Sequence, residues 1–187
     1  MPATLPPSAD GRVFDWLGTD VRGTPYHLHA LNLMWSEAGV ENDLAVYRRV
    51  GERLAGDAAY WSAIIRDVNW RYTLVGCVCL LVSRQRGFFD DLRFRFEMGS
   101  MVIPQLAVTL GLLHPVDARA CFELTLETPR LRDHPARRVS AERVLVSLGA
   151  RAASGVTLDG WSIADRDYAL LADRVVQQHW DFWSARA

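Results

Sequence analysis

The sequence predicts an all-α protein of about seven to nine helices, because apolar residues recur at spacings of three and four along most of the chain. Short polar turns with glycine, proline or a helix-capping residue separate these segments. Segments that alternate apolar and polar residues between hairpin turns, which are typical of strands, are almost absent.

The N-terminal part predicts an extended arm followed by one domain. Residues 1–26 are rich in Pro, Gly, Asp and Thr, with a single apolar cluster at Phe14, Trp16 and Leu17. We expect this cluster to dock on the rest of the protein. We expect residues 27–187 to form a single α-helical domain, because 187 residues are within the usual single-domain range.

Apolar spacing predicts helices over 26–38, 41–55 and 61–65. Asn69 is a good N-cap for the run 70–84, which is apolar on most sides and is therefore predicted to be a buried central helix.

The charged and aromatic stretch 88–99 fits both a helix and a strand. We favour a helix because its neighbours are helical and because Asp90 and Asp91 then lie in the first turn, where acids are stabilising. We expect these two acids to face Arg93 and Arg95 rather than to form a catalytic carboxylate pair with a residue such as Glu97.

Proline and capping residues divide the next part of the chain. Ser100 begins a helix with Pro104 in its first turn, and Pro115 ends that helix. Asp117 is predicted to cap a further helix that runs to about Glu127.

The C-terminal part predicts a polar loop and two helices. The loop covers 128–138, a helix covers 140–153, and a turn follows at 155–160. Ser162 and Asp165 form a capping box for the last helix. The predicted apolar stripe of that helix consists of Tyr168, Leu171, Val175 and Trp183.

One motif occurs twice, at a spacing of 48 residues. Arg71 and Arg119 each follow a capping residue by two positions and precede a large apolar residue by three. Over 58–127 the pattern resembles the turn and second helix of HEAT repeats, which are about 40–47 residues long. The resemblance implies a stack of helical hairpins with arginines that tie neighbouring hairpins together. An irregular α-bundle is the alternative.

The charged residues exclude several functions. All 21 basic residues are arginines, which is typical of a GC-rich bacterial genome and excludes a Schiff-base lysine and a Walker lysine. The net charge of −1 provides no general attraction to nucleic acid or to anionic membranes.

The cysteines and the N-terminus predict a cytoplasmic protein. The chain has three cysteines, Cys77, Cys79 and Cys121, so they cannot all be paired in disulfides. We expect them to be buried and reduced. Residues 1–12 have no apolar signal region, and the apolar run 73–82 is too short to span a bilayer.

Histidines and one serine are the candidates for chemistry. His27 and His29 are two residues apart, which brings both onto one metal only in a strand or loop, and no third ligand is evident. We therefore predict no metal and no cofactor, while the role of this pair stays open. His114 and His134 precede prolines and are predicted turn residues, and Ser100 lacks the flanking pattern of a nucleophile.

The strongest candidate for partner binding is a basic segment. Residues 128–151 contain six arginines and two acids, which gives a net charge of +4. A protein, a nucleic acid or an anionic ligand could bind there, although the segment has no aromatic residue for stacking on bases. The predicted partner-binding residues are Arg130, Arg132, Arg137, Arg138 and Arg143. A solvated loop is the alternative.

Two functions follow from these observations. The first is a non-enzymatic protein-binding module, such as an immunity-like or antitoxin-like protein or a regulatory adaptor, with a protein as the most favoured partner. The second is a helical enzyme that acts on DNA or on a small molecule. The sequence favours the first, because it contains no complete catalytic constellation.

Overall fold

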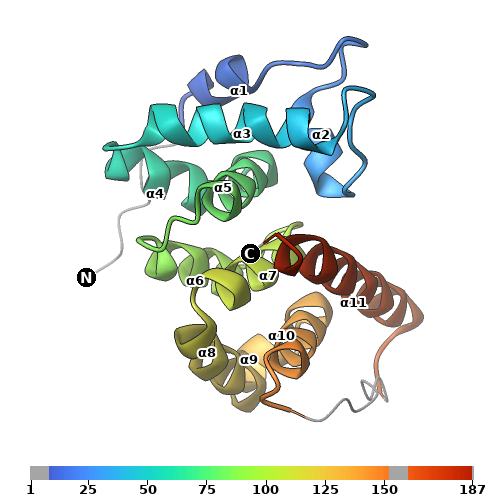
Figure 1. Cartoon of the computed structure of the whole chain (residues 1–187). Coiled ribbons are helices and arrows are strands. Elements are labelled where there is room, and N and C mark those ends of the chain that lie inside the picture. The colour runs from blue at the N-terminus through green and yellow to red at the C-terminus, as the bar shows by residue number, and fades with distance from the viewer. Residues whose placement is uncertain (1–8, 152–159, 187) are drawn as a thin grey trace. The chain divides into compact units, whose positions relative to one another are not determined.

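The protein is all-α in the residues that the computed structural model describes, which are 9–151 and 160–186 (Figure 1). These residues contain no strand, and their only β-type pairing is an isolated bridge between Thr19 and Pro25. Two short helices, over 12–17 and 129–132, lie where the sequence predicts no helix and raise the count above seven to nine. The eleven described helices are α1 (Arg12–Leu17), α2 (Tyr26–Leu31), α3 (Val40–Leu54), α4 (Ala58–Arg66), α5 (Trp70–Ser83), α6 (Phe89–Met98), α7 (Ile103–Leu113), α8 (Pro115–Glu127), α9 (Pro129–Arg132), α10 (Pro135–Ser147) and α11 (Ile163–Ser184).

The chain forms two compact units, Met1–Arg95 and Phe96–Ala187, and the boundary falls inside α6. Each unit has its own set of buried apolar side chains. The single domain over 27–187 stays a prediction. The predicted turn at 155–160 lies outside the described residues except for Gly160.

Helix α5 is the centre of the first unit, where it packs against α2, α3 and α4. Its residues 73–80 are all buried, which confirms the prediction of a buried helix for this run. Asn69 caps it as expected, because its side chain accepts a hydrogen bond from the Arg71 backbone N–H. The buried cysteines Cys77 and Cys79 lie on this helix and form no disulfide, as Cys121 also does not.

Helix α1 lies within the segment that was expected to be an extended arm. Val13 and Leu17 are buried, and the Phe14 ring packs against the ring of Tyr72 with centroids 4.5 Å apart. The Tyr60 hydroxyl of α4 lies 2.8 Å from the Asp10 backbone oxygen, to which it donates, and accepts from the Val13 N–H at 3.3 Å. Tyr60 therefore anchors the N-terminal segment on α4.

Asp91 of α6 pairs with α4, which the sequence does not predict. Its carboxylate accepts hydrogen bonds from the Arg66 guanidinium at 2.5 Å and from the Ser62 hydroxyl at 2.7 Å. Ser62 and Arg66 belong to another helix, and sequence spacing cannot show such neighbours.

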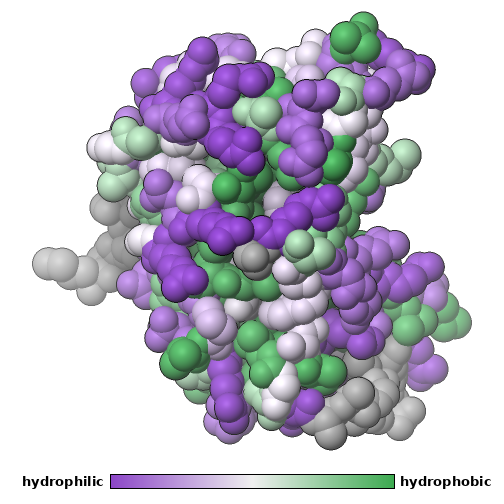
Figure 2. Space-filling model, viewed as in Figure 1, coloured by the Kyte–Doolittle hydropathy of each residue, from purple (hydrophilic) through white to green (hydrophobic). Residues whose placement is uncertain are grey.

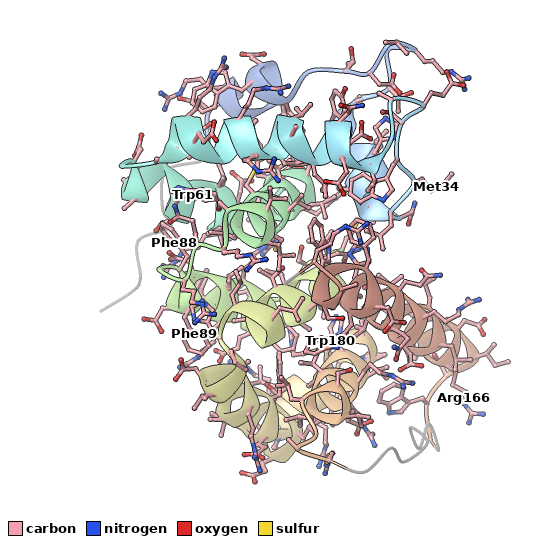
Figure 3. All side chains as sticks on the ribbon, viewed as in Figure 1. Met34, Trp61, Phe88, Phe89, Arg166 and Trp180 are labelled. Carbon is pink, nitrogen blue, oxygen red and sulfur yellow. The ribbon has the colours of Figure 1, made fainter. Side chains whose placement is uncertain are left out.

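The second unit is a bundle in which α10 packs against α7, α8 and α11, and α7 also packs against α8 and α11. Every residue of α7 except Leu112 is buried. Gly111 of α7 lies at a close approach, because a Cβ added there would be 2.6 Å from Val144 of α10 and 2.8 Å from the Trp180 ring of α11 (Figure 3). A glycine is thus needed where three helices meet.

The two His-Pro dipeptides begin helices. His114 is the N-cap of α8 and His134 is the N-cap of α10, with proline at the first helical position in both. Asp117 lies inside the first turn of α8, so the prediction that it caps this helix is wrong by three positions. Helices α9 and α10 also occupy most of the predicted loop 128–138, because prolines 129 and 135 start helices there.

We expect Gly111→Ala to lower the free energy of unfolding by about 1–2 kcal/mol, because the clash outweighs the gain in helix propensity. Gly51→Ala in α3 is the matched control. A Cβ there makes only ordinary contacts, the nearest at 3.7 Å to Ser83 Cβ, so stability should stay equal or rise by up to about 1 kcal/mol. Urea unfolding of both variants measures the difference, and equal effects would contradict this account.

Burial and the hydrogen bond with Asp10 raise the pKa of Tyr60 from 10.0 to about 12. The stability that this shift contributes is therefore complete below pH 10 and is lost as the pH rises towards about 12. We expect Tyr60→Phe to be less stable at pH 8 by about 1 kcal/mol and to lose less stability over this pH range than the wild type. Urea unfolding from pH 8 to pH 12 tests both expectations, and parallel curves for the two proteins would refute the assignment.

Candidate functional site

Helix α11 has two apolar faces, of which one is buried. The buried face consists of Ala169, Ala172, Val176, His179 and Trp183. A second row precedes most of these residues by one position, about 100° around the helix. We call Tyr168, Leu171 and Val175 the outer stripe of α11. Tyr168 is 37% exposed, Leu171 is 49% exposed and Val175 is half-buried.

The sequence predicts that Tyr168, Leu171, Val175 and Trp183 form one apolar stripe of this helix. In the structure only Trp183 of these four residues is buried. Small residues take the inner positions, since Ala169 and Ala172 are each 1% exposed. Such residues let a helix approach its neighbours closely, and α11 packs against α10 and α7.

Further apolar side chains extend the exposed surface of α11. Leu170 is 54% exposed, and Ile163 at the start of the helix is 80% exposed. Figure 2 shows hydrophobic side chains among hydrophilic ones over the N-terminal end of α11. Single exposed apolar residues are ordinary on a protein surface, whereas several on one helix indicate a binding surface.

Aromatic rings and arginines meet at the N-terminal end of α11. The Arg138 guanidinium lies 5.3 Å from the centroid of the Trp161 ring, and Arg166 donates from Nε to the Trp161 backbone oxygen at 3.1 Å. The rings of His134 and Tyr168 make an edge contact with centroids 6.2 Å apart. Figure 3 marks Arg166 at this end of the helix. We call Arg138, Trp161 and Arg166 the aromatic–arginine corner.

Sequence reasoning missed this corner, because it found no aromatic residue within 128–151. The fold supplies Trp161 and Tyr168 from the next segment. A signal existed in the capping box at Ser162, where the Oγ accepts from the Asp165 N–H at 3.2 Å and thereby fixes the start of α11 directly after Trp161.

Arg137, one of the five predicted partner-binding arginines, is buried, with an exposed fraction of 5%. It donates to the backbone oxygen of Phe96 in α6 at 3.1 Å and to that of Leu131 in α9 at 3.3 Å. Burial lowers the pKa of its guanidinium. Arg137 therefore has a structural role, and it does not face solvent.

The other four arginines differ in how strongly they are paired. Arg143 of α10 makes two hydrogen bonds of 2.7 Å with the Asp173 carboxylate of α11, and this contact raises the pKa of Arg143. Arg138 pairs with Glu142 one turn later at 3.3 Å. Arg132 pairs with Asp133 at 3.2 Å with both side chains partly in solvent, and Arg130 is exposed. Partner binding by these residues stays a prediction.

The two histidines near the N-terminus do not face a common point. His29 Nδ1 lies 2.7 Å from the Met34 backbone oxygen, and His29 Nε2 lies 3.1 Å from Asp20 Oδ2. His27 packs instead against the aromatic rings of Phe14 and Trp70. Over residues 9–151 and 160–186, no group of three or more His, Cys, Asp or Glu side chains is arranged to hold a metal ion.

The two copies of the repeated motif have local contacts. The Arg71 guanidinium lies 4.7 Å from the centroid of the neighbouring Trp70 ring, and Arg119 pairs with Glu123 one turn later at 3.1 Å. These contacts lie within α5 and α8 respectively. The resemblance to HEAT repeats stays a prediction.

The remaining candidates for chemistry have structural roles. The Ser100 hydroxyl accepts from the Val102 N–H at 3.4 Å just before α7. His134 Nδ1 accepts from the Arg137 N–H at 3.4 Å, and burial lowers the pKa of His134. Burial raises the pKa of Cys79, which disfavours the nucleophilic thiolate.

Comparisons with protein-family models, with curated proteins and with solved structures found no match to this chain. Among the described helices, none combines the length and the apolar character needed to cross a bilayer.

We expect Arg137→Met to lower the free energy of unfolding by about 2–5 kcal/mol, because it leaves two buried carbonyl groups without their donor. Arg137→Lys should lose a similar or smaller amount, since one ammonium group replaces a planar fork. Arg138→Met is the control, with a loss of about 1 kcal/mol or less for a partly exposed pair. Thermal and urea unfolding measure all three, and equal losses at 137 and 138 would contradict the structural role of Arg137.

Proposed function

We propose that this protein is a non-enzymatic protein-binding module that binds its partner through the outer stripe of α11 and the aromatic–arginine corner. The observation that carries the proposal is the exposure of Leu171, Leu170 and Ile163 on one helix, next to Tyr168 and Trp161. Leaving apolar area in water forgoes about 25 cal/mol per Å² of stabilisation, which a bound partner restores.

The residue types support a protein partner. Tyrosine, tryptophan and arginine dominate the binding energy of protein interfaces, and Tyr168, Trp161 and Arg138 lie at the corner and beside it. An aromatic ring loses little conformational entropy on binding, and the contacts with His134 and Arg138 already restrict Tyr168 and Trp161.

The predicted arrangement as a stack of helical hairpins fits this function, because such stacks present helix faces to other proteins. The partner class stays as proposed from the sequence, namely an adaptor-type or immunity-type interaction. Which genes lie beside the coding sequence bears on this choice, since a toxin, nuclease or biosynthetic cluster would each favour a different partner.

Site-specific photo-crosslinking tests the proposal in cells of the source organism. We expect a benzophenone amino acid in place of Leu170 to capture a distinct partner protein. The same amino acid in place of Leu124 of α8 is the control, because Leu124 has nearly the same exposure, 52% against 54%. Capture at 124 with none at 170 would refute the proposed surface.

A substitution series distinguishes the arginines. Arg130→Glu combined with Arg132→Glu should weaken partner capture without loss of stability, because both side chains are at the surface. Arg137→Glu is unsuitable for this test, since Arg137 is buried. Duplex DNA binding that weakens with salt, without any captured protein, would favour the DNA-directed alternative instead.

A further inference from the structure

We infer that the partner segment that binds the outer stripe of α11 is an acidic amphipathic α-helix. This inference rests on the proposed function and specifies the chemistry of the partner. It follows from the shape of the exposed row, from the charges beside it and from the absence of other recognition modes in the described residues.

The shape of the surface fits a helix. Tyr168, Leu171 and Val175 are three and four residues apart, so they form a straight ridge along α11. A partner helix can pack its own apolar row beside this ridge, as helices do in pairs 8–10 Å apart. From Tyr168 to Val175 the ridge is about 10 Å long at 1.5 Å per residue, so a partner helix of roughly 12–15 residues covers it with about one turn beyond each end. An added β-strand would need a strand edge, and the described chain has no strand.

The charges favour acidic residues on that helix. Arg138 and Arg166 lie at Trp161, and Arg130 and Arg132 are surface residues of the basic segment that contains Arg138. Arginine binds a carboxylate with two parallel hydrogen bonds when the geometry allows. Arg143 makes such a contact with Asp173, whereas the contact of Arg138 with Glu142 joins Nε to one oxygen at 3.3 Å. Arg138 therefore keeps donors for a partner carboxylate.

Acidic side chains near this surface oppose the attraction only in part. The Asp165 carboxylate accepts a hydrogen bond from the Ser162 hydroxyl, and the Asp133 carboxylate pairs with Arg132. Glu142 pairs with Arg138, and Asp167 is exposed on α11. A partner rich in glutamate competes with these acids for the same arginines. Because salt screens the attraction between arginine and carboxylate, binding of this partner must weaken as salt is added.

Two designed peptides of about 15 residues test the inference, since a helix of this length covers the ridge with about one turn beyond each end. Both place leucine at helical spacing of three and four. One has glutamate at the remaining positions and the other has lysine. We expect fluorescence anisotropy to show that the glutamate peptide binds the full chain at least tenfold more tightly than the lysine peptide, and that this preference decreases with salt.

Surface variants locate the binding. Leu171→Ser and the pair Arg138→Gln with Arg166→Gln should each weaken binding of the glutamate peptide at least fivefold. Leu170→Ser is a second variant on the exposed face, in case Leu171→Ser alters the fold, and circular dichroism checks that each variant stays helical. Leu124→Ser on α8 is the matched control and should bind as the wild type does.

The outcomes separate this inference from the proposed function. Equal binding of the two peptides, or glutamate-peptide binding that the α11 variants leave unchanged, overturns the acidic-helix inference. If crosslinking at position 170 still captures a protein, the protein-binding function stands while the inference fails. If neither peptide binds and position 170 captures nothing, both are refuted.

Discussion

The second unit depends on the hydrogen bonds that the buried guanidinium of Arg137 donates to carbonyl groups of two other helices. A helix leaves its last carbonyl groups without partners inside the helix, and Arg137 donates to one such group near the end of α6 and to another in α9. The chain turns tightly at this point, because Gly99 has φ +91° and a Cβ added there would lie 3.3 Å from the Arg137 guanidinium. Burying a guanidinium is unfavourable by itself, as its lowered pKa indicates. It is stable here because carbonyl oxygens replace the lost water.

The packing that Arg137 organises also determines which residues reach the surface. Arg137 lies in the first turn of helix α10, which packs against α7, α8 and α11. Gly111 of α7 permits the close approach of α10 and Trp180, and alanines form part of the inner face of α11. A tightly packed inner face of small residues leaves the larger Tyr168 and Leu171 partly outside. The exposed apolar row is thus a consequence of close helix packing as well as a feature available for binding.

The sequence predicts local structure well and tertiary neighbours poorly. The fold class, the buried helix after Asn69 and the helix cap at Ser162 all depend on residues within one or two turns, and the structure confirms them. The pairing of Asp91 with Arg66, and the burial of Arg137, depend on helices far apart in the chain. The stripe of α11 shows the limit of periodicity, because two adjacent rows are both apolar and spacing alone cannot tell which one faces the core.

The same distinction explains why only part of the basic segment is a candidate for binding. Its five predicted arginines look alike in sequence, but Arg137 stabilises helix ends and Arg143 is held by two hydrogen bonds to Asp173. Those nearer the start of α11, or in α9, are weakly paired or exposed. Because every cation of this chain is an arginine, each weakly paired one has a planar group that can stack on a ring and also bind a carboxylate. Arg138 already lies over the Trp161 ring. A partner with carboxylates beside an apolar row would therefore contact the charged and the apolar parts of this surface together.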